Sequence, residues 1–254
     1  MSHLHSGKSM PRPDKPRLQL NTRATPNWPT FFQTLLETAQ DERIRRYYQT
    51  PVASGDTPLS EVEFVALDFE TTGLNPQKDE IISIGLVPFT LSRIRCRESA
   101  HWIINPNRPL NEESVVIHGI TDSEVENAPD LLNILGQVLN ALAGKIVVVH
   151  YQHIERSFMN QALLSRLDEG IHFPLIDTMA IESAIQQRDC GGWLNRLRGI
   201  RPGSVRLAKA RQRYGLPVYQ PHHALTDALA TAELLQAQIA YHFSPDTPLD
   251  TIWL

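Results

Sequence analysis

Apolar residues at helical spacing set the N-terminal part of the chain apart from the rest. Residues 1–26 are polar and proline-rich, which is typical of a disordered or loosely attached tail. From Trp28 to Tyr48, apolar residues recur at helical spacing between arginines and glutamates, and this pattern predicts one amphipathic helix. Residues 49–60 contain Thr-Pro and Ser-Gly-Asp-Thr-Pro, which are typical of a linker. Residues 27–60 are therefore predicted to be a helix and linker. The helix would dock on its own domain, the simpler expectation, or on a protein partner.

Strand and helix patterns combine in one predicted domain at residues 61–243, with residues 244–254 as a C-terminal tail. Apolar runs predict strands at 64–68, 81–87, 101–104 and 145–150. Helical spacing predicts helices at 130–143, 154–168, 178–188, 204–214 and 223–242. The first two strands are expected to form a hairpin, and the fourth has a continuous β-branched run, Ile146 to Val149, as in strands buried on both faces. A hairpin followed by alternating helices and strands predicts an α/β domain with a mixed sheet.

Two carboxylates lie one residue apart at the end of the first predicted strand, in the run D-F-E-T-T-G from Asp68 to Gly73. Alternate side chains of a strand share a face, so Asp68 and Glu70 point the same way while Phe69 points into packing. Hard oxygen ligands in this arrangement suit Mg²⁺ or Mn²⁺. The alternative interpretation is a strand that ends in ordinary solvated acids.

Two later segments carry residues that would meet this pair. Glu155 lies near the start of a helix that follows the buried fourth strand. His222 and Asp227 are five residues apart, so they converge only if His222 precedes its helix, as Pro221 favours. In isolation, Glu155 and Asp227 are equally typical of acids that complement a helix dipole, and His222 of a loop residue.

Composition and charge add two expectations. The chain has 254 residues with 41% apolar content, no apolar run of membrane-spanning length and no secretory signal pattern, so we expect no membrane segment. Cys96 and Cys190 have neither metal spacing nor a disulfide framework, which indicates a reducing cytoplasm.

A basic segment stands out against the net charge of −4, because residues 188–213 alone carry +7. A local basic patch beside an acidic metal site is typical of a protein that binds a polyanion. Arg206, Lys209 and Arg211 are therefore candidate phosphate contacts. The alternative is a solvated, arginine-rich loop and helix.

Together, these motifs resemble those of the DnaQ-like 3′→5′ exonucleases of the DEDDh class, which have a ribonuclease H-like fold. The resemblance is closest to the proofreading epsilon subunit of bacterial replicative DNA polymerase and its stand-alone relatives. It rests on D-F-E-T-T-G-L from Asp68, H-x-A-L-x-D from His222, I-H-G-I-T from Ile117 and I-D-T from Ile176. It spans about Phe64 to Ala240, roughly 70% of the chain. Asp177, within I-D-T, is also expected to be a helix N-cap.

The resemblance implies a two-metal phosphodiester hydrolase with Mg²⁺ or Mn²⁺ as cofactors. Asp68 would bridge both metals, while Glu70 and Asp227 would ligate the first, directly or through water. Glu155 would hold the second through its waters. His222 would take a proton from the attacking water, since an imidazole titrates near working pH.

The resemblance also implies contacts to a single-stranded or frayed 3′ end. The apolar Leu74 would insert between the last bases, and backbone amides of the preceding residues would hold the 3′-OH. The residues so assigned to substrate binding are Thr71, Thr72, Gly73, Leu74, His118 and Gly119. A polymerase is a candidate partner for the 28–48 helix.

Glu155 departs from the family pattern, which usually has an aspartate in an N-x-x-F-D context. Glutamate keeps the charge and both oxygens but reaches one methylene further. The main prediction is a metal-dependent 3′→5′ exonuclease that releases nucleoside 5′-monophosphates from DNA. The alternatives are an exonuclease on RNA or short oligonucleotides, and a weakened nuclease kept as a nucleic-acid or polymerase binding module.

Overall fold

A mixed five-stranded sheet forms the centre of the protein. The computed structural model describes residue 20 and residues 25–106, 119–190, 199 and 201–254. Its strands are β1 (Phe64–Thr71), β2 (Ile81–Phe89), β3 (Ala100–Ile103), β4 (Ile146–Val149) and β5 (Leu175–Asp177). The sheet order is β3-β2-β1-β4-β5, with β1–β2 and β2–β3 antiparallel and β1–β4 and β4–β5 parallel. The predicted hairpin and mixed sheet are confirmed.

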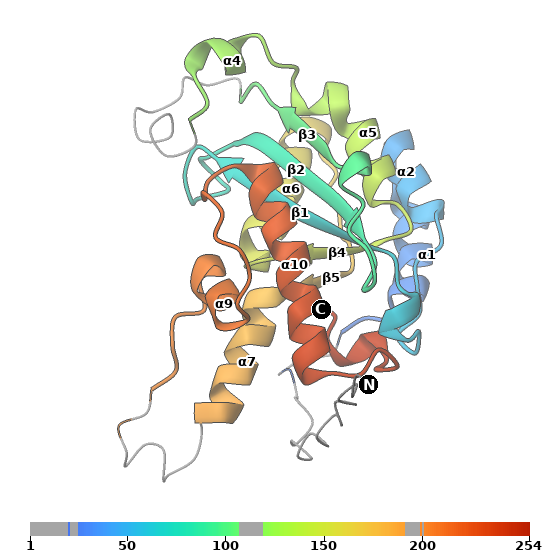
Figure 1. The fold of residues 1–254 in the computed structure, drawn as a ribbon. Coiled ribbons are helices and arrows are strands. Elements are labelled where there is room, and N and C mark those ends of the chain that lie inside the picture. Colours follow the sequence, from blue (N-terminus) through green and yellow to red (C-terminus); the bar gives the residue numbers. More distant parts are fainter. Residues whose placement is uncertain (1–19, 21–24, 107–118, 191–198, 200) are drawn as a thin grey trace, which may run out of the picture.

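Helices cover both faces of this sheet (Figure 1). The described helices are α1 (Trp28–Thr38), α2 (Glu42–Gln49), α4 (Asp122–Glu126), α5 (Leu131–Leu142), α6 (Gln152–Leu167), α7 (Thr178–Cys190), α9 (Leu207–Arg213) and α10 (Ala224–His242), with short 3₁₀ turns at Leu59–Glu61, Cys96–Glu98 and Leu249–Thr251. Helix α10 lies across one face, against β1 and β2, and α5 and α6 lie on the other. The fold is the predicted α/β, ribonuclease H-like arrangement.

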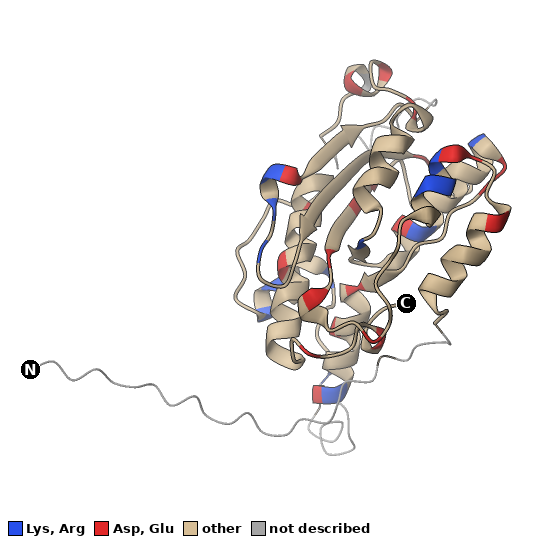
Figure 2. Cartoon of the chain, turned by 90° about the vertical axis from the view of Figure 1, so that its right-hand side faces the viewer, with Lys and Arg blue, Asp and Glu red and all other residues tan. Residues whose placement is uncertain are grey.

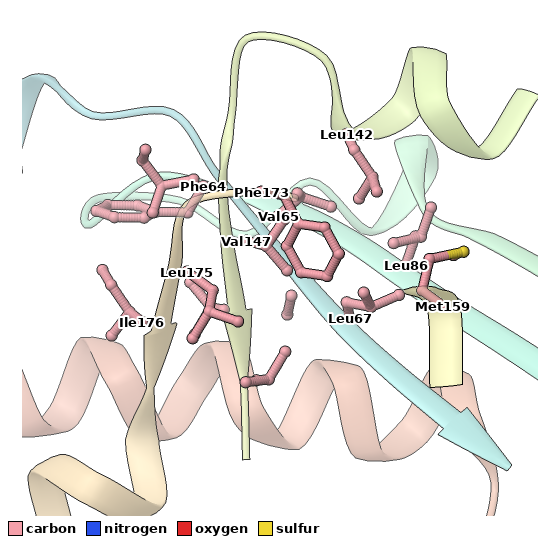
Figure 3. Close-up of a cluster of buried hydrophobic side chains, with 14 of the residues drawn as sticks. Phe64, Val65, Leu67, Leu86, Leu142, Val147, Met159, Phe173, Leu175 and Ile176 are labelled. Atoms are coloured by element: carbon pink, nitrogen blue, oxygen red, sulfur yellow. The ribbon is translucent and has the colours of Figure 1, made fainter. Parts of the chain in front are cut away.

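The core forms where the central strands meet the helices. Figure 3 shows Phe64, Val65 and Leu67 of β1 among side chains of β4, β5 and α6. All four residues of β4 are fully buried, because helices cover both of its faces, as its β-branched run predicts. This rigid centre holds the end of β1, where Asp68 and Glu70 lie, in a fixed position.

Gly85 of β2 lets the start of α10 approach the sheet closely. A Cβ atom there would lie 2.3 Å from the backbone carbonyl carbon and oxygen of Ala224, which leaves no room for any side chain. Gly85 is the register partner of Asp68 in the β1–β2 pairing. The glycine therefore allows the helix that carries Asp227 to reach the end of β1.

The N-terminal extension differs from the prediction of one helix over 28–48. It forms two helices, because Asp41 accepts the backbone N–H of Arg43 and begins α2, while Glu169 accepts the N–H groups of Gln40 and Asp41 between them. Its apolar side chains are buried in the core of the same chain, namely those of Trp28, Phe32, Ile44, Tyr47 and Tyr48. Docking on its own domain, the simpler expectation, is confirmed, and this apolar face is not available to a partner.

The last residues of the chain also belong to the core. Leu249, Ile252 and Trp253 are buried, and the backbone N–H of Leu254 donates to Leu175 O at 2.7 Å. Their prediction as a separate tail was wrong, because polar and proline residues around the short apolar segment hide its burial from a periodicity analysis. The strand β5 and the short helix α4 were also not predicted. Among the described residues, the structure has no helix of sufficient length and apolarity to span a membrane.

Candidate active site

Three carboxylates from two elements converge at the end of β1. Ligand oxygens of Asp68, Glu70 and Asp227 all lie within 4.8 Å of one another. Asp68 and Glu70 share one face of β1, as the alternation of a strand requires, while Phe69 is buried. The pairing register shifts between Glu70 and Thr71, so the chain leaves the regular sheet directly after the second acid. Asp227 comes from the first turn of α10.

His222 precedes α10, as its proposed convergence with Asp227 requires. Its backbone is in the left-handed region (φ 70°), and its N–H donates to Asp227 Oδ2 at 2.8 Å. His223 is the N-cap of α10, and its Nδ1 accepts the N–H of Thr226 at 3.4 Å. The His222 side chain is exposed beside the carboxylates. The tight turn therefore fixes the loop histidine and the helical aspartate relative to each other.

Glu155 is buried on the neighbouring helix α6. Its side chain is only 2% exposed, and within the described part of the chain its Oε2 has no hydrogen-bond partner. Burial raises the pKa of Glu155 to about 8, with a further contribution from the charge of Asp177. Glu155 is not one of the three clustered ligands, but its charge acts on Asp68. The fourth predicted acid thus lies next to the cluster.

The pKa shifts of the clustered acids show the cost of this arrangement. Burial, followed by the charges of Glu155, Asp227 and Glu70, raises the pKa of Asp68 well above its usual value. Burial likewise raises the pKa of Asp227, although the His222 N–H partly offsets this by stabilising the ionised form. Hard oxygen donors that repel one another, together with an unpartnered buried carboxylate oxygen, fit a divalent cation.

Asp177 holds two helices in place around this site. Its Oδ1 accepts the N–H groups of Met179 and Ala180, which confirms the predicted N-cap of α7. The same carboxylate accepts the N–H groups of Tyr151 and Gln152 at 3.1 and 3.0 Å, at the start of α6. It therefore fixes the helix end that carries Glu155.

The segment after Glu70 forms a turn pinned by Asp79. Thr71 Oγ1 donates to Gly73 O at 2.6 Å, and Asp79 accepts the N–H of Asn75 at 2.8 Å. A Cβ at Gly73 would lie 2.5 Å from the Asp79 carboxylate, so a larger residue there would require the Asp79 side chain to move. Leu74 is 81% exposed. The turn thus presents one large apolar side chain to solvent beside the carboxylates.

Gly119, another predicted substrate-binding residue, lies shortly before α4. Gly119 is exposed and has a positive φ of 67°, a conformation that glycine adopts without strain. His118 lies outside the described residues.

The three basic candidates separate into two groups. Arg206 and Lys209 are exposed. Arg211 is 3% exposed, and it donates to the carbonyls of Ala230 and Pro217 and to Glu233 Oε2 at 2.6, 2.9 and 2.7 Å. The prediction of Arg211 as a phosphate contact was wrong, because its guanidinium is occupied in holding α9 against α10.

Sequence analysis missed a group of polar residues behind Glu70. Ser83 is the register partner of Glu70, and its Oγ lies 2.7 Å from His101 Nε2. The rings of His101 and His223 lie 4.8 Å apart, and burial followed by the charge of His223 lowers the pKa of His101. The available signal was Ser83 itself, a polar residue in an otherwise apolar buried strand.

The fold and the site together define a nuclease of the DEDDh type: two acids on a central strand, one on a flanking helix, and a histidine and an acid at the last helix. The Exonuclease (RNase_T) family model matches residues 65–235. The chain belongs to this exonuclease family.

Relatives with known names agree with this assignment. The chain is 30% identical over 181 residues to the DNA polymerase III subunit epsilon of Treponema pallidum, covering 71% of this chain and 78% of that protein. It is 33% identical over 181 residues to the PolC-type DNA polymerase III of Thermotoga maritima, again over 71% of this chain. The matched region is only 12% of that much longer polymerase.

Solved structures share the fold at low sequence identity. The nuclease domain of 3′hExo, a DEDDh family member bound to rAMP, superposes with a TM-score of 0.56 at 18% identity, over 70% of this chain and 92% of that domain. Cell-death related nuclease 4 superposes with a TM-score of 0.58 at 22% identity, over 72% of this chain and 65% of that one.

Proposed function

We propose that this protein is a metal-dependent 3′→5′ exonuclease that hydrolyses the terminal phosphodiester bond of single-stranded or frayed DNA and releases nucleoside 5′-monophosphates. The observation that carries this proposal is the convergence of Asp68, Glu70 and Asp227 within 4.8 Å, with the His222 loop fixed to Asp227. The homology to an epsilon subunit of DNA polymerase III supports the choice of DNA.

The carboxylates would hold two divalent cations, Mg²⁺ or Mn²⁺, with Asp68 shared between them and Glu155 acting through water. Divalent cations at such a site lower the pKa of a bound water and neutralise charge on attacking and leaving oxygens. The protein's own contribution is rigidity, since β1 and α10 fix the three acids before substrate arrives.

His222 is proposed to accept the proton of the attacking water at its imidazole. Its backbone N–H is committed to Asp227, which orients the residue while the side chain stays exposed toward the substrate. A neutral imidazole is a suitable base near neutral pH and a weak competitor for hard cations. The proton would leave to solvent through this open side.

Selection of the strand end is proposed to come from the turn after Glu70. The exposed Leu74 would pack between the last two bases, and backbone amides of the turn would bind the terminal 3′-OH, except that of Thr72, which donates to Glu80 O at 2.9 Å. His118 and Gly119 would lie along the terminal nucleotide. These contacts do not depend on base identity, so specificity would be for the end and for single strands.

A polymerase partner, RNA as a second substrate and a cytoplasmic location are also proposed. An epsilon homologue supports association with a polymerase, although through a surface other than the buried apolar face of α1 and α2. RNA is the second candidate substrate, because one structural neighbour is described as recognising a histone mRNA stem-loop. Cys96 and Cys190 are both free, in keeping with the predicted cytoplasmic location.

The test is degradation of a 5′-labelled single-stranded DNA with Mg²⁺ or Mn²⁺, compared with Asp68→Ala. We expect a ladder that shortens from the 3′ end, and a rate reduced about 10³-fold or more in the variant. Competing deoxy- and ribo-strands would then rank the two substrates. A folded protein that binds the strand but does not shorten it with either metal would favour a binding module, with Glu155 as the cause.

A further inference from the structure

A pocket lies beside His222, and most of its lining has no role in the site described above. It has a volume of about 310 Å³ and lies between α9 and the loop before α10, with Asp227 and Ala230 of α10 among the residues that line it. The lining is mainly apolar and includes Ala208, Leu216 and Tyr219. His222 belongs to the same lining, so the pocket opens next to the reacting phosphate of the proposed exonuclease.

The walls of this pocket are fixed before any ligand binds. The guanidinium of Arg211 lies 4.7 Å from the centroid of the Tyr219 ring, and the Tyr219 hydroxyl donates to Glu233 Oε1 at 3.0 Å. Arg211 also ties α9 to the Ala230 carbonyl. An aromatic ring held from two sides is preorganised, which lowers the entropic cost of binding. The buried Arg211 therefore has a clear use as a support for the pocket.

Size and chemistry favour one aromatic heterocycle as the occupant. The volume is at the lower end of the range for ligand sites, roughly 300–1,000 Å³, and suits a single ring with its sugar. A tyrosine among apolar side chains is a stacking surface for a base, and the exposed Arg206, also in the lining, complements a phosphate attached to it. An unmodified peptide segment carries no phosphate that could pair with Arg206.

The position of the pocket indicates which base of the bound strand it would hold. The 3′-terminal nucleotide and one face of the next base are assigned to the turn from Thr71 to Leu74, and none of those residues is among the described residues that line the pocket, which leaves the pocket for the other side of that next base. We infer that the pocket binds the base of the nucleotide on the 5′ side of the scissile phosphate. This inference rests on the proposed function. It makes Tyr219 and Ala208 residues that determine how firmly the leaving 3′-oxygen is held.

The experiment uses single-stranded DNA with one abasic position: at the penultimate nucleotide, at the terminal nucleotide, or five nucleotides further in. For the wild type, we expect the penultimate abasic strand to have a kcat/KM about tenfold lower than the inner abasic strand, the size of a lost base–aromatic contact. Equal values for these two strands would overturn the inference. This comparison requires no variant, so folding does not affect it.

A filling variant connects the effect to the pocket. Ala208 is exposed on α9, so Ala208→Trp adds bulk to the lining without removing an internal contact. It should lower kcat/KM about tenfold on the intact strand and remove the sensitivity to the penultimate base. The control is Ala240→Trp, at an exposed position on α10 outside the pocket lining, which should behave as wild type. An Ala208→Trp enzyme that keeps the full abasic effect would show that the base binds elsewhere.

A binding measurement separates this inference from the proposed function. The same abasic series is prepared with a methylene phosphonate at the terminal linkage, which cannot be hydrolysed there, and Kd is measured by fluorescence anisotropy. If no strand is ever degraded but the penultimate abasic strand binds about tenfold more weakly, the pocket inference stands and the exonuclease proposal fails. If strands are degraded and both abasic profiles are flat, the exonuclease stands and the pocket inference fails.

Discussion

The acidic end of β1 and the basic segment at 188–213 are both dense in charge, yet the structure treats the two charges in opposite ways. At the acidic site, Asp68, Glu70 and Asp227 are gathered within 4.8 Å, and the buried Glu155 Oε2 has no partner among the described residues. In the basic segment, Arg211 is buried against carbonyls and Glu233. Figure 2 shows acidic and basic residues side by side on several peripheral helices and loops.

Two further arginines of the basic segment also have carboxylate partners within the chain. Arg213 donates to Glu182, which is itself 1% exposed, and Arg188 donates to Asp189. Arg211 and Arg213 therefore stabilise the packing of α9 against α10 and α7. Charge density in a sequence does not distinguish structural from functional charge. The difference lies in the partners of each charge, because a cluster of like charges is costly unless a ligand neutralises it.

The largest expected effect is the loss of stability when the buried arginine of the basic segment is replaced. Arg211→Met should destabilise the protein by about 3 kcal/mol, because it leaves buried carbonyls and a carboxylate without their donor. Urea denaturation measures this change in the free energy of unfolding. The matched control is Lys209→Met, an exposed change on the same helix, which should stay within about 0.5 kcal/mol. Equal stability of the two variants would show that Arg211 is not structural.

A second prediction concerns the pH dependence of the metal-free protein. In the unfolded chain a glutamate loses its proton near its usual pKa of 4.5, whereas folded Glu155 keeps it until about 8. The folded state thus binds more protons between these values, so stability should fall as pH rises from about 4.5 to 8. In EDTA, we expect the wild-type Tm to fall by several degrees over this range, and Glu155→Gln to show a shallower fall.

The control for the pH experiment is Glu42→Gln, which changes an exposed carboxyl of α2. Its Tm profile should follow that of the wild type. A Glu155→Gln profile as steep as that of the wild type would mean that this buried carboxyl is not the one that titrates.

The smallest effect is expected from the basic residues left exposed. Arg206→Ala combined with Lys209→Ala should weaken binding of single-stranded DNA several-fold. It should also reduce the magnitude of the slope of log binding constant against log salt concentration by about 1.4, since each lost phosphate contact contributes about 0.7. Anisotropy titrations from low to physiological salt would measure this slope. An unchanged slope would assign this exposed pair to a solvated surface.

Much of the fold was readable from local patterns. The β-branched run 145–150, the hairpin after Asp68 and the long helix after His223 follow from periodicity and from turn residues, and the structure confirms them. The break between α1 and α2 was missed although Asp41 is a local N-cap signal, and the contact that reinforces it comes from Glu169, 128 residues away from Asp41. The burial of Leu249 to Trp253 is likewise a tertiary contact without a local signal.

For the candidate site, the sequence predicted the ligands better than their surroundings. Spacing on a strand placed Asp68 and Glu70, and Pro221 with a helix start placed Asp227 near His222. Residue spacing in the sequence does not reveal burial, so it could not show that Glu155 is desolvated or that Arg211 is internal. The His101–Ser83 contact was also out of reach, because it depends on the register of β2 with β3.

The most direct test of the central claim, that the acidic end of β1 is a cluster of repelling carboxylates suited to a cation, is the Tm of wild type and Asp68→Asn at pH 8 in EDTA and in Mg²⁺ or Mn²⁺. We predict that the variant melts higher than the wild type in EDTA, because one of the repelling carboxylates is gone. The metal should then raise the wild-type Tm and leave the variant nearly unchanged. A variant that melts lower in EDTA, together with a wild-type Tm that does not respond to either metal, would contradict the account.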